Sequence, residues 1–142
     1  MASPSLPTKL IALAVAAMAV LGACGEQNSY GAAEESLSAW LAAVESGDED
    51  ACDFETRAYH DELARENIAV GGDEITCQEL VARMAAMPGP QAMPPSDSDI
   101  EVPAWDPSGE ALVEVTRSDT EKVEDFWMVY EDGAWRVDGD ER

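Results

Sequence analysis

A proline-rich segment divides the chain into two parts with different hydrophobic patterns. Five of the eight prolines lie between residues 88 and 103, and residues 88–98 form the densest part. Because proline lacks a backbone N–H and restricts the residue before it, we expect an extended linker here that cannot be helical. Apolar residues recur at helical spacing before the linker and alternate with polar residues after it. This order predicts an α+β fold, with N-terminal helices packed on an antiparallel sheet.

Before the linker, three segments have apolar residues at the spacing of a helix. The first covers residues 30–46 and ends at a Gly-Asp pair; its apolar face consists of Leu37, Trp40, Leu41 and Val44. The second covers about residues 50–65 and is interrupted near Thr56. The third begins near Thr76, which has Glu79 at the spacing of a capping box. We therefore expect three N-terminal helices.

After the linker, four short segments have the composition of strands. We predict strands over residues 100–105, 110–117, 123–130 and 134–138. The sequence Asp106-Pro107-Ser108-Gly109 has the residue preferences of a type I turn. Pro103 favours an edge position for the first strand, because it has no N–H to donate to a neighbour. Short turns between successive strands predict a curved antiparallel sheet of about four strands.

The N-terminal residues have the pattern of a secretory signal. Lys9 precedes the apolar run 10–21, and Gly22 and Ala23 precede Cys24. The order Leu-Gly-Ala-Cys resembles the lipobox of bacterial lipoproteins, which implies cleavage after residue 23 and acyl chains on Cys24. A membrane-spanning helix would need about 20 apolar residues, so the run is too short for that alternative. An ordinary secretory signal cleaved at the same place is the other alternative.

This pattern predicts how the chain is organised. Residues 1–23 would be the signal peptide, residues 24–29 the lipidated cysteine and a short tether, and residues 30–142 a single extracytoplasmic domain. The lipid anchor would hold that domain on the outer face of the cell membrane, and we expect no other membrane contact.

The charge of the chain excludes some partners. Thirty acidic residues stand against eight basic ones, so the formal net charge is −22. Nucleic acids and anionic lipids are bound through clusters of lysine and arginine, so we expect no nucleic-acid partner. The acids are interpreted as a solvated surface, with a basic partner or loosely held divalent cations as alternatives.

Two cysteines remain if Cys24 is lipidated. Outside the cytoplasm disulfides persist, so Cys52 and Cys77 are predicted to form one. In the chain-entropy model a loop of this length contributes about 3.5 kcal/mol. Two free thiols or a metal site are the alternatives, but the single histidine, His60, offers few further ligands.

Two further segments resemble the nuclear transport factor 2-like superfamily. The first helix carries Ser38-Ala39-Trp40-Leu41-Ala42-Ala43, and the last hairpin carries Gly133-Ala134-Trp135-Arg136-Val137. Among its members, the resemblance is to small bacterial lipoproteins with two cysteines that correspond to Cys52 and Cys77. It implies a cone-shaped sheet wrapped around a helix, with a pocket between them. Only four strands are predicted here, so the cone would be small or shallow.

No motif fixes a catalytic site. The isomerases of that superfamily use a tyrosine and two acids in an apolar pocket, but nothing in the sequence places Tyr59 or Tyr130 in one. The candidates for a pocket or its rim are four aromatic residues: Trp40, Tyr59, Tyr130 and Trp135. We predict no catalytic residue, no cofactor and no metal, because the acidic triplets 48–50 and 97–99 lack the spacing of a calcium loop.

The sequence therefore favours a non-catalytic binding or interaction module at the cell envelope, with a protein or small-molecule partner. An acidic, cation-responsive surface protein and a small pocket enzyme of the isomerase type are the alternatives.

Overall fold

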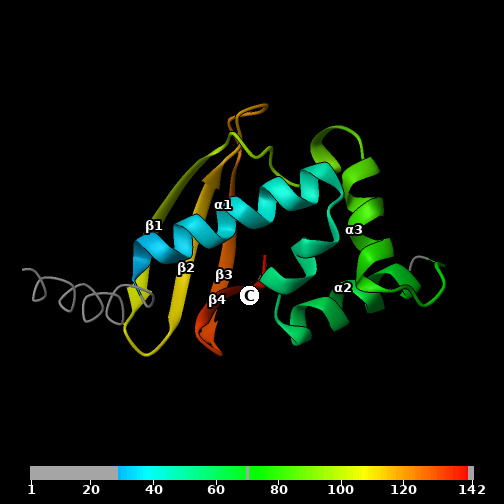
Figure 1. Ribbon diagram of the computed structural model, residues 1–142. Helices are drawn as coiled ribbons and strands as arrows, with labels where there is room; N and C mark the ends of the chain where they lie inside the picture. Colours follow the sequence, from blue (N-terminus) through cyan, green and yellow to red (C-terminus); the bar gives the residue numbers. More distant parts are fainter. Residues whose placement is uncertain (1–28, 70, 141–142) are drawn as a thin grey trace, which may run out of the picture.

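The computed structural model describes residues 29–69 and 71–140. The predicted signal peptide, Cys24 and the tether up to residue 28 lie outside the described residues. The described part is an α+β fold in which helices pack on an open, four-stranded antiparallel sheet (Figure 1). None of the described helices has both the length and the apolar content needed to cross a membrane.

The first helix has the boundaries that the sequence predicts. Helix α1 runs over Tyr30–Ser46, and the Ser29 side chain accepts the N–H of Ala32 at its start. Gly47 ends the helix with a φ of 69°, a left-handed conformation that glycine adopts without a steric penalty. The buried residues of α1 are those of the expected apolar face together with Ala33.

The second predicted helix consists of two separate elements. A 3₁₀ helix, η1, covers Glu49–Phe54, and α2 covers Arg57–Ala69. Between them residues 55–56 are extended, as the interruption near Thr56 suggested. Helix α3 covers Cys77–Ala86, and the predicted capping box between Thr76 and Glu79 is present.

The prediction of a linker without helix is wrong in one place. Residues Gly89–Gln91 form a single 3₁₀ turn, η2, with Pro90 at its start. A proline is tolerated there because the N–H groups of a first helical turn have no partner within the helix. The rest of the linker leads into the sheet without regular structure.

The four strands pair in sequence order. They are β1 (Asp99–Asp106), β2 (Glu110–Thr116), β3 (Val123–Glu131) and β4 (Ala134–Gly139). Strand β1 is at the edge, as Pro103 predicts, and its register with β2 shifts between Glu101 and Ala104. Asp106–Gly109 makes the expected tight turn, in which the Gly109 N–H donates to the Asp106 carbonyl.

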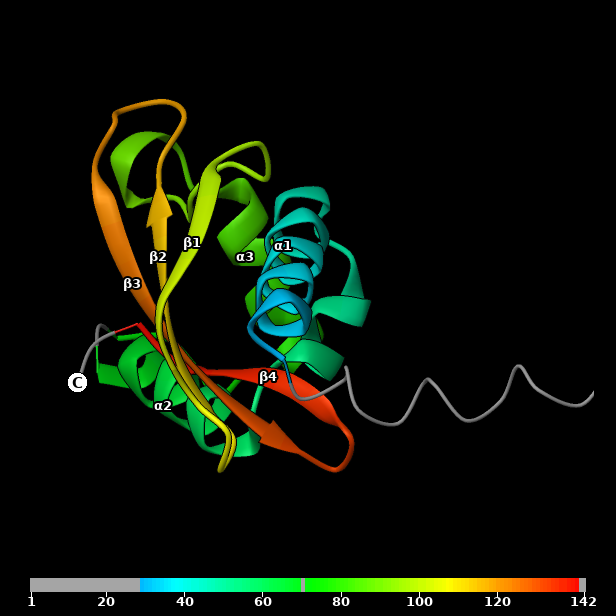
Figure 2. The same cartoon turned by 90° about the vertical axis from the view of Figure 1, so that its left-hand side faces the viewer.

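The core lies between α1 and one face of the sheet. Figure 2 shows the sheet bending around α1, with α3 on the same side and α2 beneath. Trp40 is completely buried and meets the ring of Phe126 from β3 at 5.7 Å, edge to face. Alternate residues of β2 and β3 face this helix layer and are buried: Ala111, Val113, Val115, Phe126 and Met128. The interior is thus filled by side chains.

Candidate functional site

The most unusual buried side chain is Glu55, in the extended segment between η1 and α2. This segment pairs with β4: Glu55 forms a parallel bridge with Val137, and the Thr56 N–H donates to the Val137 carbonyl. The Thr56 hydroxyl donates to Asp138 and accepts the N–H of Tyr59, which fixes the start of α2. Glu55 is held against the core in this way, and only 5% of it is exposed.

The Glu55 carboxyl group lies between Trp40 and the disulfide. Its Oε1 accepts the indole N–H of Trp40 at 3.0 Å, and its Oε2 lies 3.9 Å from Sγ of Cys77. Burial raises the pKa of Glu55, while the Trp40 hydrogen bond and the positive form of His60 act in the opposite direction. The buried carboxyl group is therefore harder to ionise than an exposed one.

The disulfide itself is present, as predicted. Cys52 of η1 and Cys77, the first residue of α3, are bonded, with their Cα atoms 6.0 Å apart. Both residues are partly exposed. They line a cleft of about 310 Å³ together with Glu55 and His60. The bond therefore fastens η1 to α3 and also borders solvent-accessible space.

A larger hollow lies at the other end of α1, against the edge of the sheet. Its volume is about 790 Å³, and four of the residues that line it are acidic: Glu34 and Glu35 from α1, and Asp99 and Glu101 from β1. We call it the acidic groove. Ile100 and Ser38 are uncharged residues that also line its walls.

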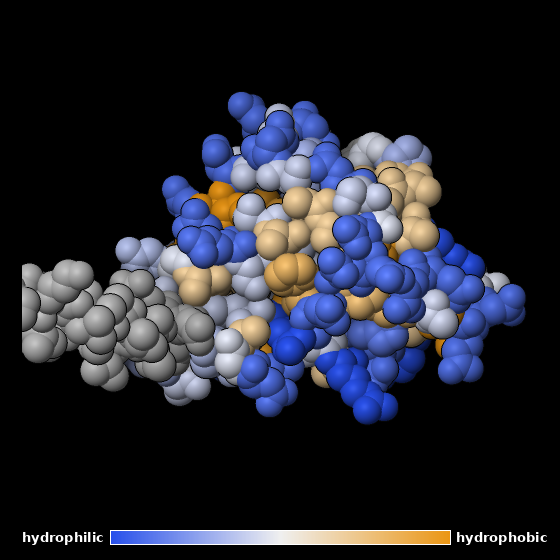
Figure 3. Space-filling model, viewed as in Figure 1, coloured by the Kyte–Doolittle hydropathy of each residue, from blue (hydrophilic) through white to orange (hydrophobic). Residues whose placement is uncertain are grey.

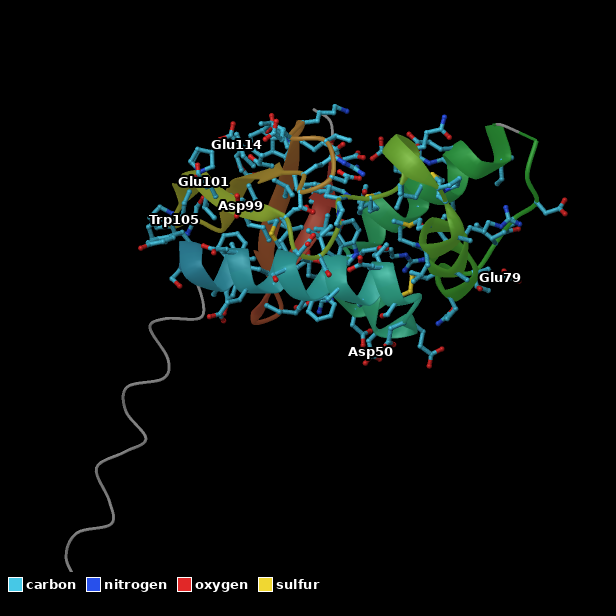
Figure 4. The ribbon with its side chains drawn as sticks, turned by 90° about the horizontal axis from the view of Figure 1, so that it is seen from above. Asp50, Glu79, Asp99, Glu101, Trp105 and Glu114 are labelled. Carbon is cyan, nitrogen blue, oxygen red and sulfur yellow. A yellow bond between two sulfur atoms is a disulfide. The ribbon has the colours of Figure 1, made fainter. Side chains whose placement is uncertain are left out.

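Strand β1 also carries an exposed aromatic ring. Trp105 is 41% exposed and is not among the residues that line the acidic groove. Asp99 and Trp105 lie near opposite ends of β1, and Figure 4 shows both at the other end of the molecule from Asp50 and Glu79. Figure 3 shows mostly hydrophilic residues on the face seen in Figure 1, interrupted by paler and apolar residues over α1. Strand β1 thus contributes acidic side chains to the groove near its start and an exposed indole near its end.

The four aromatic residues that were candidates for a pocket rim occupy other positions. Trp40 and Tyr59 are 0% and 1% exposed, and Trp135 is 3% exposed, so all three are core residues. Tyr130 is partly buried and packs edge to face on Trp135 at 5.6 Å. Trp40, Tyr59 and Trp135 are buried because the helices lie directly on the sheet.

Two of these core residues keep an unsatisfied polar atom. The Tyr59 hydroxyl and the Trp135 indole nitrogen are buried, and neither has a hydrogen-bond partner among the described residues. Burial also raises the pKa of Tyr59, with nearby acids acting in the same direction. Tyr59 therefore stays neutral, and it lines none of the clefts described above.

The burial of Glu55 and Arg117 was not predicted from the sequence. An isolated acid among many acids carries no signal of burial. A weak signal did exist for Glu55, because it directly precedes the interruption predicted near Thr56, inside a helical stretch that carries apolar residues on both sides. His60, which the sequence offered only as a scarce metal ligand, is partly buried beside Glu55.

Comparisons with known proteins add no family. No protein-family model matches the chain, and no curated protein or solved structure is significantly similar to it. The functional argument therefore depends on the residues themselves.

Proposed function

We propose that this chain is a lipid-anchored, extracytoplasmic lipoprotein that acts as a binding module for a cationic partner. The Leu-Gly-Ala-Cys sequence that ends at Cys24 supports the anchor. The Cys52–Cys77 disulfide agrees with an oxidising compartment. The sheet that bends around α1 supports a small nuclear transport factor 2-like cone (Figure 2).

The acidic groove is the observation that carries the binding role. Four acidic side chains from two elements converge on one hollow, and the same strand, β1, exposes the indole of Trp105 further along. Lysine and arginine side chains pair with carboxylates and also stack on aromatic faces. A basic segment of a partner protein that fills the groove and extends along β1 is the ligand that uses both features. The net charge of −22 would also attract such a partner from a distance.

Binding can be measured with a peptide of nine arginines as the probe. At physiological salt we expect saturable binding to the full chain in detergent, seen as a change in tryptophan fluorescence. The variant Glu35→Gln/Asp99→Asn/Glu101→Gln should weaken binding at least tenfold. The variant Asp61→Asn/Glu62→Gln/Glu66→Gln removes the same charge from α2 and is the matched control. Equal weakening by both variants would mean that net charge, and not the groove, attracts the peptide.

The anchor is tested separately. Replacing Cys24 with alanine should abolish metabolic labelling with palmitate and leave an uncleaved precursor, because no other residue can accept the diacylglycerol group. Labelling that survives the substitution would remove the basis for the proposed localisation. Two or more acyl chains suffice for stable attachment, where one is marginal.

A further inference from the structure

The buried carboxyl group of Glu55 is one of four neighbouring side chains that can bind metals. Ligand atoms of Glu55, His60 and Cys77 all lie within 4.8 Å of one another. Cys52 is bonded to Cys77, so its sulfur is at the same place. The four residues come from η1, the extended segment 55–56, α2 and α3. Besides the disulfide, η1 and α3 are each held by contacts with α1.

The spacing is close to that of a tetrahedral zinc site. Zinc binds sulfur at about 2.3 Å and nitrogen or oxygen at about 2.0–2.2 Å, so its ligand atoms lie about 3.3–3.8 Å apart. Ligand atoms within 4.8 Å need to move by only about 1 Å to reach this geometry. The two bonded sulfurs are too close together for tetrahedral zinc binding. A sulfur in a disulfide is also not a thiolate, which is the form that binds zinc.

The oxidised state leaves polar atoms of this cluster poorly satisfied. Glu55 Oε2 faces Sγ of Cys77, and a disulfide sulfur has no proton to donate. Trp40 is the hydrogen-bond donor that the described residues provide to this carboxyl group, and it serves the other oxygen. Nδ1 of His60 is buried and has no partner among the described residues. The cluster thus holds a buried carboxylate oxygen and a buried imidazole nitrogen that lack a full set of partners among the described residues.

The charges around the cleft permit a cation. Arg57 and Arg136 line it, but so do Glu131 and Asp132. The Arg136 guanidinium is engaged, since it donates to the Asp53 carbonyl and lies 3.8 Å from Glu131. The chain as a whole is strongly negative, which attracts cations to its surface.

We propose that Cys52, Glu55, His60 and Cys77 form a redox-gated site for a thiophilic divalent cation such as Zn²⁺. A dithiol donor would open it: the donor is oxidised to its disulfide, and the protein disulfide is reduced to two thiols. Metal binding then displaces both thiol protons to solvent and joins the two thiolates, the imidazole and the carboxylate around one ion. In the oxidised protein the sulfur ligands are absent and the site is closed.

Cobalt is the probe for this site, because a tetrahedral thiolate complex of Co²⁺ has intense visible and near-ultraviolet bands. The full chain with Cys24→Ser, which removes the third thiol, is reduced with dithiothreitol in detergent and desalted without oxygen. We expect one Co²⁺ per chain with tetrahedral bands, displaced by one Zn²⁺. The same protein with its disulfide intact is the control and should give no bands.

Two conservative variants separate this site from a simple pair of cysteines. Glu55→Gln keeps an oxygen that can accept the Trp40 N–H, and His60→Gln keeps the polarity of α2. Each should weaken Zn²⁺ binding at least tenfold, while Glu62→Gln, an exposed position on α2, should not. Unchanged affinity in both variants would overturn the proposal, because two thiolates alone would then account for binding.

The fold of the reduced protein is monitored by circular dichroism in the same titration. If reduction loosens the structure, Zn²⁺ at one equivalent should restore the helical signal and raise the melting temperature. A reduced chain that stays unfolded with Zn²⁺, or that stays folded and binds none, would also overturn the proposal.

Discussion

Arg117 and Glu55, the two buried charged residues in the described part of the chain, differ in how completely their polar atoms are paired. Arg117 follows β2 and is 2% exposed. Its Nε and one terminal nitrogen donate to the two oxygens of Asp119, each at 2.8 Å, and its other terminal nitrogen donates to Ala92 and Glu124. Every nitrogen of the guanidinium group is engaged. The bidentate pair raises the pKa of Arg117 and lowers that of Asp119.

Glu55 is buried to a similar degree but has one conventional hydrogen-bond partner among the described residues. Its carboxyl group accepts the N–H of Trp40 and otherwise faces the disulfide and His60. A charged group whose bonds are complete fixes structure: Arg117 joins the linker at Ala92 to the turn between β2 and β3. A group whose bonds are incomplete is where a proton or an ion can be exchanged. Arg117 therefore has the pairing of a structural residue, while the incomplete pairing of Glu55 agrees with the metal site proposed above.

Replacing Arg117 should give the largest loss of stability. Arg117→Met keeps much of the volume but removes the donor that the Ala92 carbonyl, Asp119 and Glu124 share. Removing one partner of a buried ion pair destabilises by about 3–5 kcal/mol, so we expect a loss in that range by urea unfolding. Arg65→Met, at an exposed position on α2, should stay within about 0.5 kcal/mol of wild type. A small effect of Arg117→Met would mean that the complete pairing of Arg117 contributes little to the stability of the fold.

Removing the disulfide should have the next largest effect. Cys52→Ser/Cys77→Ser should lower the free energy of unfolding by about 2–4 kcal/mol, because the unfolded chain regains the freedom of the closed loop. A peptide map without reductant should show residues 52 and 77 crosslinked in the native protein. If both thiols react with an alkylating agent before reduction, the bond is absent and this stabilisation is absent with it.

The elements were predictable because each has a local signal. Capping residues, apolar spacing and turn residues identified α1, the start of α3 and the four strands. Helix η1 was merged with α2, because a short 3₁₀ helix has no apolar period of its own. The turn at residues 89–91 was missed because prolines argue against long helices but permit a single turn.

The candidate sites were less predictable, because they depend on contacts between distant segments. Glu55 is buried only because its extended segment pairs with β4, more than 80 residues further along the chain. The acidic groove needs α1 and β1 to lie side by side, which no local pattern specifies. The disulfide was the exception, since the sequence prediction assigned Cys24 to the lipid anchor, and the two cysteines that remain allow one pairing.

The pH dependence of stability tests whether burial of the Glu55 carboxyl group makes it harder to ionise. Its pKa in the folded protein is raised above the ordinary value of 4.5, so folding favours the protonated form. Below pH 4.5 Glu55 is protonated in both the folded and the unfolded chain, so its burial does not lower stability. As the pH rises through the raised pKa, the unfolded chain ionises more easily than the folded one, and the folded state loses stability. Glu55→Gln carries no such penalty. Its stability should match that of wild type near pH 4 and exceed it at pH 8.

The measurement is urea unfolding of both proteins from pH 4 to pH 8. Glu62→Gln removes an equal charge from the surface and corrects for the general repulsion among the acids. If the gain at high pH is the same for both variants, burial of Glu55 has no separate effect on its titration.

The smallest effect concerns charges on the surface of the sheet, which water solvates, so that an unpaired charge there costs little stability. Glu101, Glu114 and Asp125 are direct neighbours across β1, β2 and β3. Like charges at such positions repel, and opposite charges attract, with effects of about 0.2–1 kcal/mol. Glu114→Lys should therefore stabilise the protein within that range, Glu114→Gln by less, and 1 M salt should reduce both gains by screening. Glu74→Lys, at an exposed loop position, changes the net charge equally. An equal gain from Glu74→Lys would mean that the repulsion is spread over the whole surface, and the row of acids across the sheet would then have no particular energetic role.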